Sequence, residues 1–251
     1  MKKNIEKKGS LLSSLSQRTL GKKRSDLFKN SKGSLEDKIN SFTVYSSRQN
    51  VAKLIAQYEL VKETKNVLGD IIEAGVYYGS GLMGWANILA SIEPYNYQCK
   101  IIGFDTFEGS KGVTKKDLIY KRIQRRDGEY NANSFNDLKK SIDIFNEDRP
   151  LAHLDKVKLV KGDIVKTSKI YAKENPAQAI RILHIGMNIY TPTFHTLKNF
   201  LPRMSKGSIV AIDGLNYATA GCMTALREII NTNDFELKTI DYYPNFSYFK
   251  L

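Results

Sequence analysis

Residues 69–81, GDIIEAGVYYGSG, hold the feature around which the fold of this 251-residue chain is predicted. The apolar run Asp70-Ile71-Ile72 is typical of a short buried strand, which ends at Glu73 and a tight turn. Gly79 then opens a predicted helix over residues 82–92. Glycine lets a ligand approach the backbone closely, and a helix N-terminus offers unpaired N–H groups to a polar ligand. The segment therefore predicts a ligand-binding turn at one edge of an α/β sheet.

A second predicted strand, residues 100–104, ends in Asp105. The carboxyl ends of neighbouring parallel strands line a crevice, where an acid can bind a ribose. Three residues separate Gly75 from Gly79, so the dinucleotide fingerprint Gly-x-Gly-x-x-Gly is absent. An acid before the first glycine and another after the next strand fit S-adenosylmethionine (SAM), which has no pyrophosphate. The turn alone could also serve only close packing, so both interpretations stay open at this point.

The rest of the chain alternates strands and helices. Further strands are expected at residues 157–160, 180–185, 208–212, 236–240 and 247–249, and helices within residues 46–67, 134–145, 193–201 and 224–230. This alternation predicts a doubly wound, mostly parallel sheet with helices on both faces. Asp163 and Asp213 follow two of these strands, so four acids are expected to share one edge of the sheet.

The net charge of +13 is unevenly distributed. Residues 1–40 hold eleven Lys or Arg and four acids, so this segment carries +7 of the total. We expect a basic flexible tail over 1–40, a catalytic domain over 41–251, and a lid-like insertion over 110–133. The domain lacks a basic face interleaved with aromatics, which makes nucleic acid an unlikely partner. No apolar run could span a bilayer, and two cysteines form no framework, so a cytoplasmic protein is expected.

Several motifs, in order along the chain, resemble one known family. They are RQN at 48–50, IEAGV at 72–76, IGFDTFEG at 102–109, LVKGD at 159–163 and FLPRM at 200–204. From about residue 42 onward the chain resembles the macrocin O-methyltransferase family, whose members transfer a methyl group from SAM to sugar hydroxyls. The GFDTFEG block is the most specific of these motifs.

The resemblance implies a class I SAM-methyltransferase fold, Rossmann-like, with seven strands of which the last is antiparallel. It implies a sugar or sugar-nucleotide acceptor and a homo-oligomer. It also implies a set of cofactor contacts. The implied contacts are Glu73, Gly75, Tyr77, Gly79 and Ser80 around the methionine part, Asp105 at the ribose with Thr106 and Phe107 beside it, and Asp163 at the adenine end.

The residues expected to carry out catalysis depart from the family's pattern. Relatives of this kind carry Asp-x-Asp-x-Tyr-x-Pro-Thr after the fourth strand, where this chain has Gly186 and Asn188. Those acids hold a divalent cation, usually magnesium, and one acts as base. Asp213, Asn188 and Asn216 remain as candidate ligands, a poor set for a hard cation. The catalytic candidates are therefore Asp213, Asn188 and His184; the histidine is either a replacement base or a buried strand residue.

Two functions follow from these observations. The leading one is SAM-dependent O-methylation of a sugar or glycan-precursor hydroxyl, with the metal-binding acids largely replaced. The alternative is a catalytically impaired relative that keeps the fold and serves as a SAM-binding or assembly subunit.

Overall fold

The structure is a computed structural model, and it describes residues 19–118, 125–215 and 220–251. The chain forms two compact units, Met1–Ala52 and Lys53–Leu251. Their border falls inside helix α5 (Arg48–Glu63), whereas the sequence analysis divided the chain after residue 40. Among the described residues, no helix is both long enough and apolar enough to cross a membrane.

The described part of the first unit, from residue 19, contains the short helices α2 (Leu20–Asn30), α3 (Leu35–Asn40) and α4 (Phe42–Tyr45), followed by the start of α5. A capping box starts α3, because Asp37 N donates to Ser34 Oγ at 3.1 Å and Ser34 N donates to Asp37 Oδ2 at 2.9 Å. Lys38 Nζ donates to the carbonyl of Phe28 at 2.6 Å. Local helices thus occupy part of the predicted tail, and its flexibility remains a prediction. Residues 1–18 lie outside the described chain.

The second unit contains one seven-stranded sheet in the order β3-β2-β1-β4-β5-β7-β6. The first five strands pair in parallel, and β7 runs antiparallel to both β5 and β6. The strands are β1 (Asp70–Ala74), β2 (Ile101–Asp105), β3 (Val157–Lys161), β4 (Ile180–Ile185), β5 (Met204–Asp213), β6 (Lys238–Ile240) and β7 (Tyr243–Lys250). The predicted doubly wound, mostly parallel sheet is confirmed.

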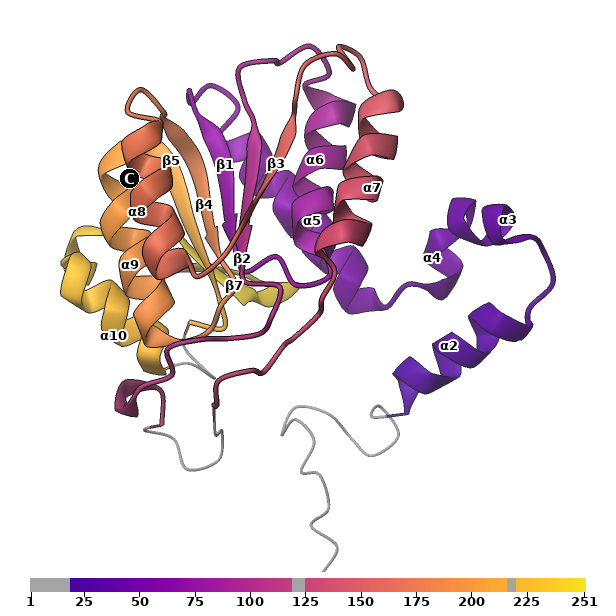
Figure 1. Cartoon of the computed structure of the whole chain (residues 1–251), viewed down its shortest axis with the longest axis horizontal. Coiled ribbons are helices and arrows are strands. Elements are labelled where there is room, and N and C mark those ends of the chain that lie inside the picture. Colours follow the sequence, from indigo (N-terminus) through magenta and orange to yellow (C-terminus); the bar gives the residue numbers. More distant parts are fainter. Residues whose placement is uncertain (1–18, 119–124, 216–219) are drawn as a thin grey trace, which may run out of the picture. The chain divides into compact units, whose positions relative to one another are not determined.

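Helices cover both faces of this sheet (Figure 1). One face packs against α5, α6 (Ser80–Ile92) and α7 (Phe135–Glu147), whose apolar residues form a core that includes the fully buried Trp85. The other face packs against α8 (Ile164–Glu174), α9 (Tyr190–Phe200) and α10 (Ala220–Ile229). Three short 3₁₀ turns complete the described elements: η1 (Lys115–Asp117), η2 (Leu201–Arg203) and η3 (Thr232–Asp234). The helix α8 was not predicted.

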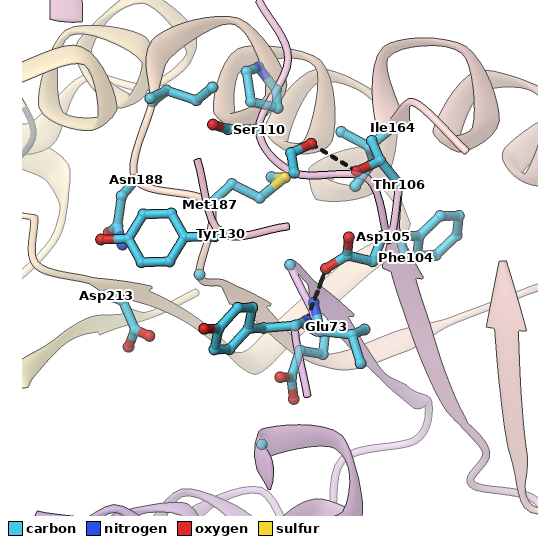
Figure 2. A pocket seen from close by; sticks show the side chains of 18 of the residues that line it. Glu73, Phe104, Asp105, Thr106, Ser110, Tyr130, Ile164, Met187, Asn188 and Asp213 are labelled. Atoms are coloured by element: carbon cyan, nitrogen blue, oxygen red, sulfur yellow. Dashed lines mark hydrogen bonds between the residues drawn. The ribbon is translucent and has the colours of Figure 1, made fainter. Parts of the chain in front are cut away.

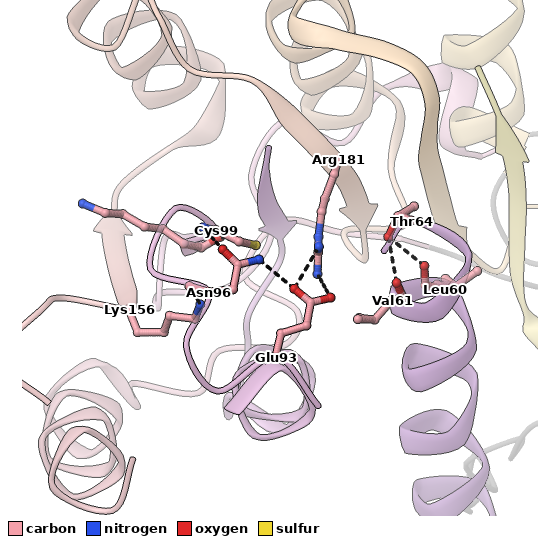
Figure 3. Close-up of polar contacts among 9 residues, drawn as sticks. Leu60, Val61, Thr64, Glu93, Asn96, Cys99, Lys156 and Arg181 are labelled. Atoms are coloured by element: carbon pink, nitrogen blue, oxygen red, sulfur yellow. Dashed lines mark hydrogen bonds and ion pairs between the residues drawn. The ribbon is translucent and has the colours of Figure 1, made fainter. Parts of the chain in front are cut away.

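A buried ion pair stabilises the edge at which the parallel strands begin (Figure 3). Arg181, only 1% exposed, donates from both terminal nitrogens to the Glu93 carboxylate, each at 3.1 Å. Asn96 donates to the same carboxylate at 2.7 Å and accepts from Cys99 N at 3.2 Å. Burial raises the pKa of the Cys99 thiol to about 11, so this thiol stays protonated. The pair joins β4 to the end of α6 and leaves the opposite edge open for a ligand.

Candidate cofactor and acceptor site

A cavity of about 280 Å³ lies at the carboxyl ends of β1, β2, β4 and β5, close to the lower end of the range of about 300–1,000 Å³ for small-molecule sites. The predicted site residues that line it are Glu73, Gly75, Tyr77, Ser80, Asp105, Thr106, Asp163, His184, Asn188 and Asp213. Figure 2 shows Asp105 and Thr106 on one side, Asn188 and Asp213 on the other, and Glu73 between them. One cavity therefore joins the predicted cofactor residues to the predicted catalytic residues.

Glu73 forms the buried floor of this cavity. This residue is the second-last of β1, its side chain is almost fully buried, and its Oε2 has no hydrogen-bond partner in the described chain. The carboxylate fits because Gly81 has no side chain; a Cβ there would lie 2.3 Å from Glu73 Oε1. The N-terminus of α6 is adjacent, and its dipole favours a negative charge. A buried carboxylate with a free oxygen suits the ammonium group of an amino acid.

Asp105 organises the turn after β1. Its Oδ2 accepts hydrogen bonds from Val76 N at 2.7 Å and Tyr77 N at 2.8 Å, and its Oδ1 accepts one from Phe107 N at 2.7 Å. Tyr77 has a φ of 56°, a left-handed conformation that these bonds hold in place. The predicted ribose ligand thus has a structural role as well. Each carboxylate oxygen can accept two bonds, so Oδ1 keeps capacity for a ribose hydroxyl.

Two predicted cofactor contacts do not line the cavity. Gly79 has a φ of 87° and caps α6, and a Cβ at this position would lie 2.0 Å from Leu138 Cδ2. Phe107 is 2% exposed and packs edge-on against Phe135, with ring centroids 5.2 Å apart. The structure gives both residues a packing role in the wall behind the turn.

Asp163 and the insertion close the cofactor side of the cavity. Asp163 accepts a bond from Val165 N at 3.0 Å and so caps α8. The ends of the predicted insertion are tied together, since Ser110 N donates to Glu129 O at 2.7 Å. Ser110 and Tyr130 of this insertion line the cavity. Residues 119–124 lie outside the described chain.

The insertion is also anchored to the opposite side of the cavity, which Asn188 and Asp213 line and which is called the acceptor end below. Asp117, 6% exposed, accepts a hydrogen bond from Tyr190 N at 2.6 Å at the first residue of α9. Lys116 Nζ pairs with Glu228 of α10 at 2.6 Å. The start of α9 directly follows Asn188 and Ile189, so these contacts help fix the wall that carries Asn188.

His184 lies between two carboxylates. Its Nδ1 is 3.6 Å from Glu73 Oε2 and its Nε2 is 3.3 Å from Asp213 Oδ1. Neither contact meets the geometry of a hydrogen bond, so the pairing is an electrostatic attraction at short range. Burial lowers the pKa of His184, but Asp213 and then Glu73 outweigh it and raise that pKa to about 9. A histidine that is protonated near neutral pH cannot accept a hydroxyl proton, so the structure favours a charge-balancing role over the predicted replacement base.

Asn188 and Asp213 present free oxygens at the acceptor end. Asn188 has a φ of 58°, and its Oδ1 is buried without a hydrogen-bond partner in the described chain, as is Asp213 Oδ1. Gly186 lies beside them, and a Cβ there would be 3.5 Å from Asp213 Oδ2. Asn216, the third predicted metal ligand, lies outside the described residues. Two acceptor oxygens directed at a cavity suit the hydroxyl groups of a sugar.

The sequence analysis missed Lys53. This residue of α5 lines the cavity at the same end as His184 and Asp213. Burial lowers the pKa of Lys53, yet the charges of Glu73 and Asp213, with Tyr243, outweigh burial and raise it. A single lysine in an amphipathic helix gives no signal in the sequence, because its position near two strand ends depends on tertiary packing.

The residues at this end do not suit magnesium. Glu73 and Asp213 are the carboxylates that line the acceptor end in the described chain, and a protonated His184 faces both of them. Gly186 offers no side-chain ligand, and Asn188 offers one neutral oxygen. Across residues 19–118, 125–215 and 220–251, no group of three His, Cys, Asp or Glu could hold a metal ion. Hard cations prefer sites with uncompensated carboxylate charge, which this end does not offer.

The sheet order with an antiparallel β7, together with a buried acid at the end of β1 and an acid at the end of β2, defines a class I SAM-dependent methyltransferase fold. Residues 10–249 match the profile of the macrocin O-methyltransferase (TylF) family, and the chain belongs to this family. The match begins well before residue 42, where the sequence analysis placed the start of the resemblance.

Solved structures of similar proteins agree with this assignment. A crystal structure of CalS11, a calicheamicin methyltransferase, has 27% identity and a TM-score of 0.89, covering 95% of this chain and 93% of that one. An apo structure of CalS11, described as a TDP-rhamnose 3'-O-methyltransferase, has 27% identity and a TM-score of 0.82, covering 95% of each chain. The O-methyltransferase NovP shares the fold, with 20% identity, a TM-score of 0.61 and 78% of each chain covered. Curated protein sequences gave no significant match.

Proposed function

We propose that this chain transfers the methyl group of SAM to a hydroxyl of a sugar, with a sugar nucleotide as the acceptor. One observation carries the proposal: a single cavity joins Glu73 and Asp105, at the ends of β1 and β2, to Asn188, shortly after β4, and Asp213, at the end of β5. Family membership and the likeness to CalS11, a TDP-rhamnose 3'-O-methyltransferase, support the choice of acceptor.

The cofactor side of the cavity suits SAM. The Glu73 carboxylate at the cavity floor would accept a hydrogen bond from the ammonium group of the methionine part. Asp105 Oδ1 is available to a ribose hydroxyl, and Asp163 and Ile164 line the far end, where the adenine is placed in this proposal. SAM supplies an electrophilic methyl group on a positively charged sulfur. These contacts would direct that methyl group toward the acceptor end.

The acceptor side supplies a base and a positioning group. The Asp213 carboxylate takes the proton of the reacting hydroxyl, and Asn188 Oδ1 accepts a hydrogen bond from a neighbouring hydroxyl. The hydroxyl proton becomes strongly acidic as the new O–CH₃ bond forms, so an ordinary carboxylate is basic enough to take it. The insertion, with Tyr130 at the cavity, would exclude water from the reacting groups. No step needs a divalent cation.

Calorimetry and a transfer assay test this function. SAM and its demethylated product, S-adenosylhomocysteine, are each titrated into the protein, and a panel of sugar nucleotides, including TDP-rhamnose, is assayed for methylation by mass spectrometry. Asp213→Asn should lower kcat about a hundredfold or more while leaving product affinity within a few-fold. Absence of SAM binding at high micromolar concentration would refute the cofactor assignment. Normal SAM binding with no turnover on any acceptor would instead favour the non-catalytic alternative, which rests only on Gly186 and Asn188.

We also propose that the protein forms a homo-oligomer and acts in the cytoplasm. It is supported by the family resemblance, and light scattering after size exclusion would measure the oligomeric state. A monomer at micromolar concentration would contradict it.

A further inference from the structure

In the described chain, Glu73, Asp213, His184 and Lys53 lie together in the wall of the cavity. His184 faces Glu73 and Asp213 with its two ring nitrogens, and Lys53 lies on the cavity wall from helix α5. We propose that Lys53 provides the positive charge at the acceptor oxygen, so that methyl transfer by this chain needs no divalent cation. This inference rests on the proposed function and assigns one further residue to it.

The position of Lys53 is fixed by the packing of α5. Gln57, one turn later on the same helix, donates from Nε2 to the Gly81 carbonyl at 2.9 Å in a buried hydrogen bond. This bond holds α5 against the start of α6, which borders Glu73. The Phe246 ring of β7 lies beneath the lysine, with the Lys53 ammonium 5.9 Å from its centroid. The ammonium is therefore held at the cavity rather than free in solvent.

The ammonium is charged and open to a ligand. Glu73 and Asp213 favour the protonated form of Lys53 by more than burial disfavours it. Lys53 nevertheless makes no direct ion pair within the described chain, where the direct carboxylate contacts at this end belong to His184. A lysine that is attracted by two carboxylates without contacting either can donate a hydrogen bond to an oxygen between them.

The same arrangement disfavours a divalent ion. The two ring nitrogens of His184 already lie against Glu73 Oε2 and Asp213 Oδ1, so a metal ion bound to these oxygens would have to displace the imidazole. Lys53 lines the same cavity, and its ammonium would repel a cation with two charges. Gly186 provides no side-chain ligand to offset this repulsion.

The chemistry is balanced without a metal. The acceptor oxygen forms a bond to the methyl carbon, the carbon–sulfur bond breaks, and its electron pair remains on sulfur. The hydroxyl proton passes to Asp213 and then to solvent. Lys53 donates a hydrogen bond to the same oxygen and stabilises the negative charge that develops as the proton leaves.

The experiment compares Lys53→Met, which keeps the length of the side chain, with Lys53→Arg, which keeps the charge. Lys62→Met, an exposed lysine on the same helix, is the matched control. We expect kcat to fall about a hundredfold in Lys53→Met and by less than tenfold in Lys53→Arg. The control should match the wild type. Chelator should not change wild-type turnover.

A second measurement does not depend on turnover. Mg²⁺ and Mn²⁺ are titrated by calorimetry into each protein saturated with S-adenosylhomocysteine. The wild type should show no stoichiometric binding up to millimolar metal, and Lys53→Met should bind metal at least tenfold more tightly than Lys53→Arg. Stoichiometric Mg²⁺ binding by the wild type, lost in Asp213→Asn, would overturn the proposal.

The affinity for S-adenosylhomocysteine distinguishes a role of Lys53 at the acceptor oxygen from a role in cofactor binding. If Lys53→Met weakens S-adenosylhomocysteine binding more than tenfold at unchanged kcat, Lys53 binds the cofactor carboxylate and the proposal is wrong. Wild-type levels of turnover in Lys53→Met would refute the role of Lys53 and leave the proposed function standing. A wild type without turnover would refute the proposed function, while the metal titration would still decide whether this end rejects divalent ions.

Discussion

Asp105→Asn separates two roles of one carboxylate. The structure gives Asp105 three backbone hydrogen bonds, from Val76 N, Tyr77 N and Phe107 N. Asparagine has one acceptor oxygen, so its carbonyl can keep the two bonds to the turn after β1, while its NH₂ group then faces the N–H of Phe107. The substitution removes the negative charge from all three bonds and leaves one donor facing another.

The expected loss of stability in Asp105→Asn follows from these three hydrogen bonds. A hydrogen bond to a charged group contributes about 1.5–3 kcal/mol, and one such bond is lost outright. A change of 1 kcal/mol shifts the melting temperature of a domain of this size by about 2–4 °C. We therefore expect Asp105→Asn to lower the melting temperature of the ligand-free protein by roughly 4–10 °C. We also expect it to weaken SAM binding about tenfold or more.

Differential scanning fluorimetry without ligand and SAM titration by calorimetry measure the two effects. Asp143→Asn, an exposed carboxylate on α7, is the control and should change neither quantity. A variant that loses SAM affinity while melting like the wild type would refute the structural role, and Asp105 would then act as a ribose ligand alone.

The remaining predictions concern stability. His184→Gln leaves the buried Glu73 and the partly buried Asp213 without their shared cation and should lower the free energy of unfolding by about 3–5 kcal/mol. The pKa of His184 in the folded protein is raised from 6.5 to about 9, so its contribution to the free energy of unfolding is present below pH 6.5 and lost as the pH rises through about 9. Urea unfolding across this pH range should show the loss in the wild type and not in His184→Gln. Arg181→Met should cost about 3–5 kcal/mol by stranding Glu93, and the double variant with Glu93→Leu should recover most of it in urea unfolding; no recovery would contradict a stabilising role for the pair. Gly79→Ala should cost about 2–4 kcal/mol, from the left-handed backbone and the clash with Leu138, and thermal melting equal to the wild type would contradict that geometry.

The sequence predicted the sheet because its signals are local. The apolar runs at β1, β2, β4 and β5 are short and end at acids or glycines, which is typical of buried parallel strands. The helix α8 was missed because Asp163, its N-cap, was assigned with the other strand-end acids to the ligand crevice. A capping residue and a ligand at a strand end have the same sequence signature.

The site was predictable only in part, for a physical reason. Glu73 and Asp163 occupy strand ends, and the fold brings strand ends together. Phe107 and Gly79 belong to the same two strand-end motifs. Whether such a residue faces the cavity or the core depends on its packing, here against Phe135 for Phe107 and against Leu138 for Gly79. Lys53 could not be found in advance, since no local pattern links a helix residue to a particular strand end.

The close approach of Gly81 to Glu73 has a consequence for how this site can change over evolutionary time. A Cβ at position 81 would lie 2.3 Å from Glu73 Oε1 and 2.8 Å from Glu73 Oε2. No single replacement of Gly81 is compatible with the carboxylate where it stands, and replacing Glu73 first removes the buried charge that the proposed cofactor needs. The two positions are therefore expected to vary together or not at all. Descendants that have given up methyl transfer should be recognisable by a side chain at position 81 joined to a shorter or uncharged residue at position 73.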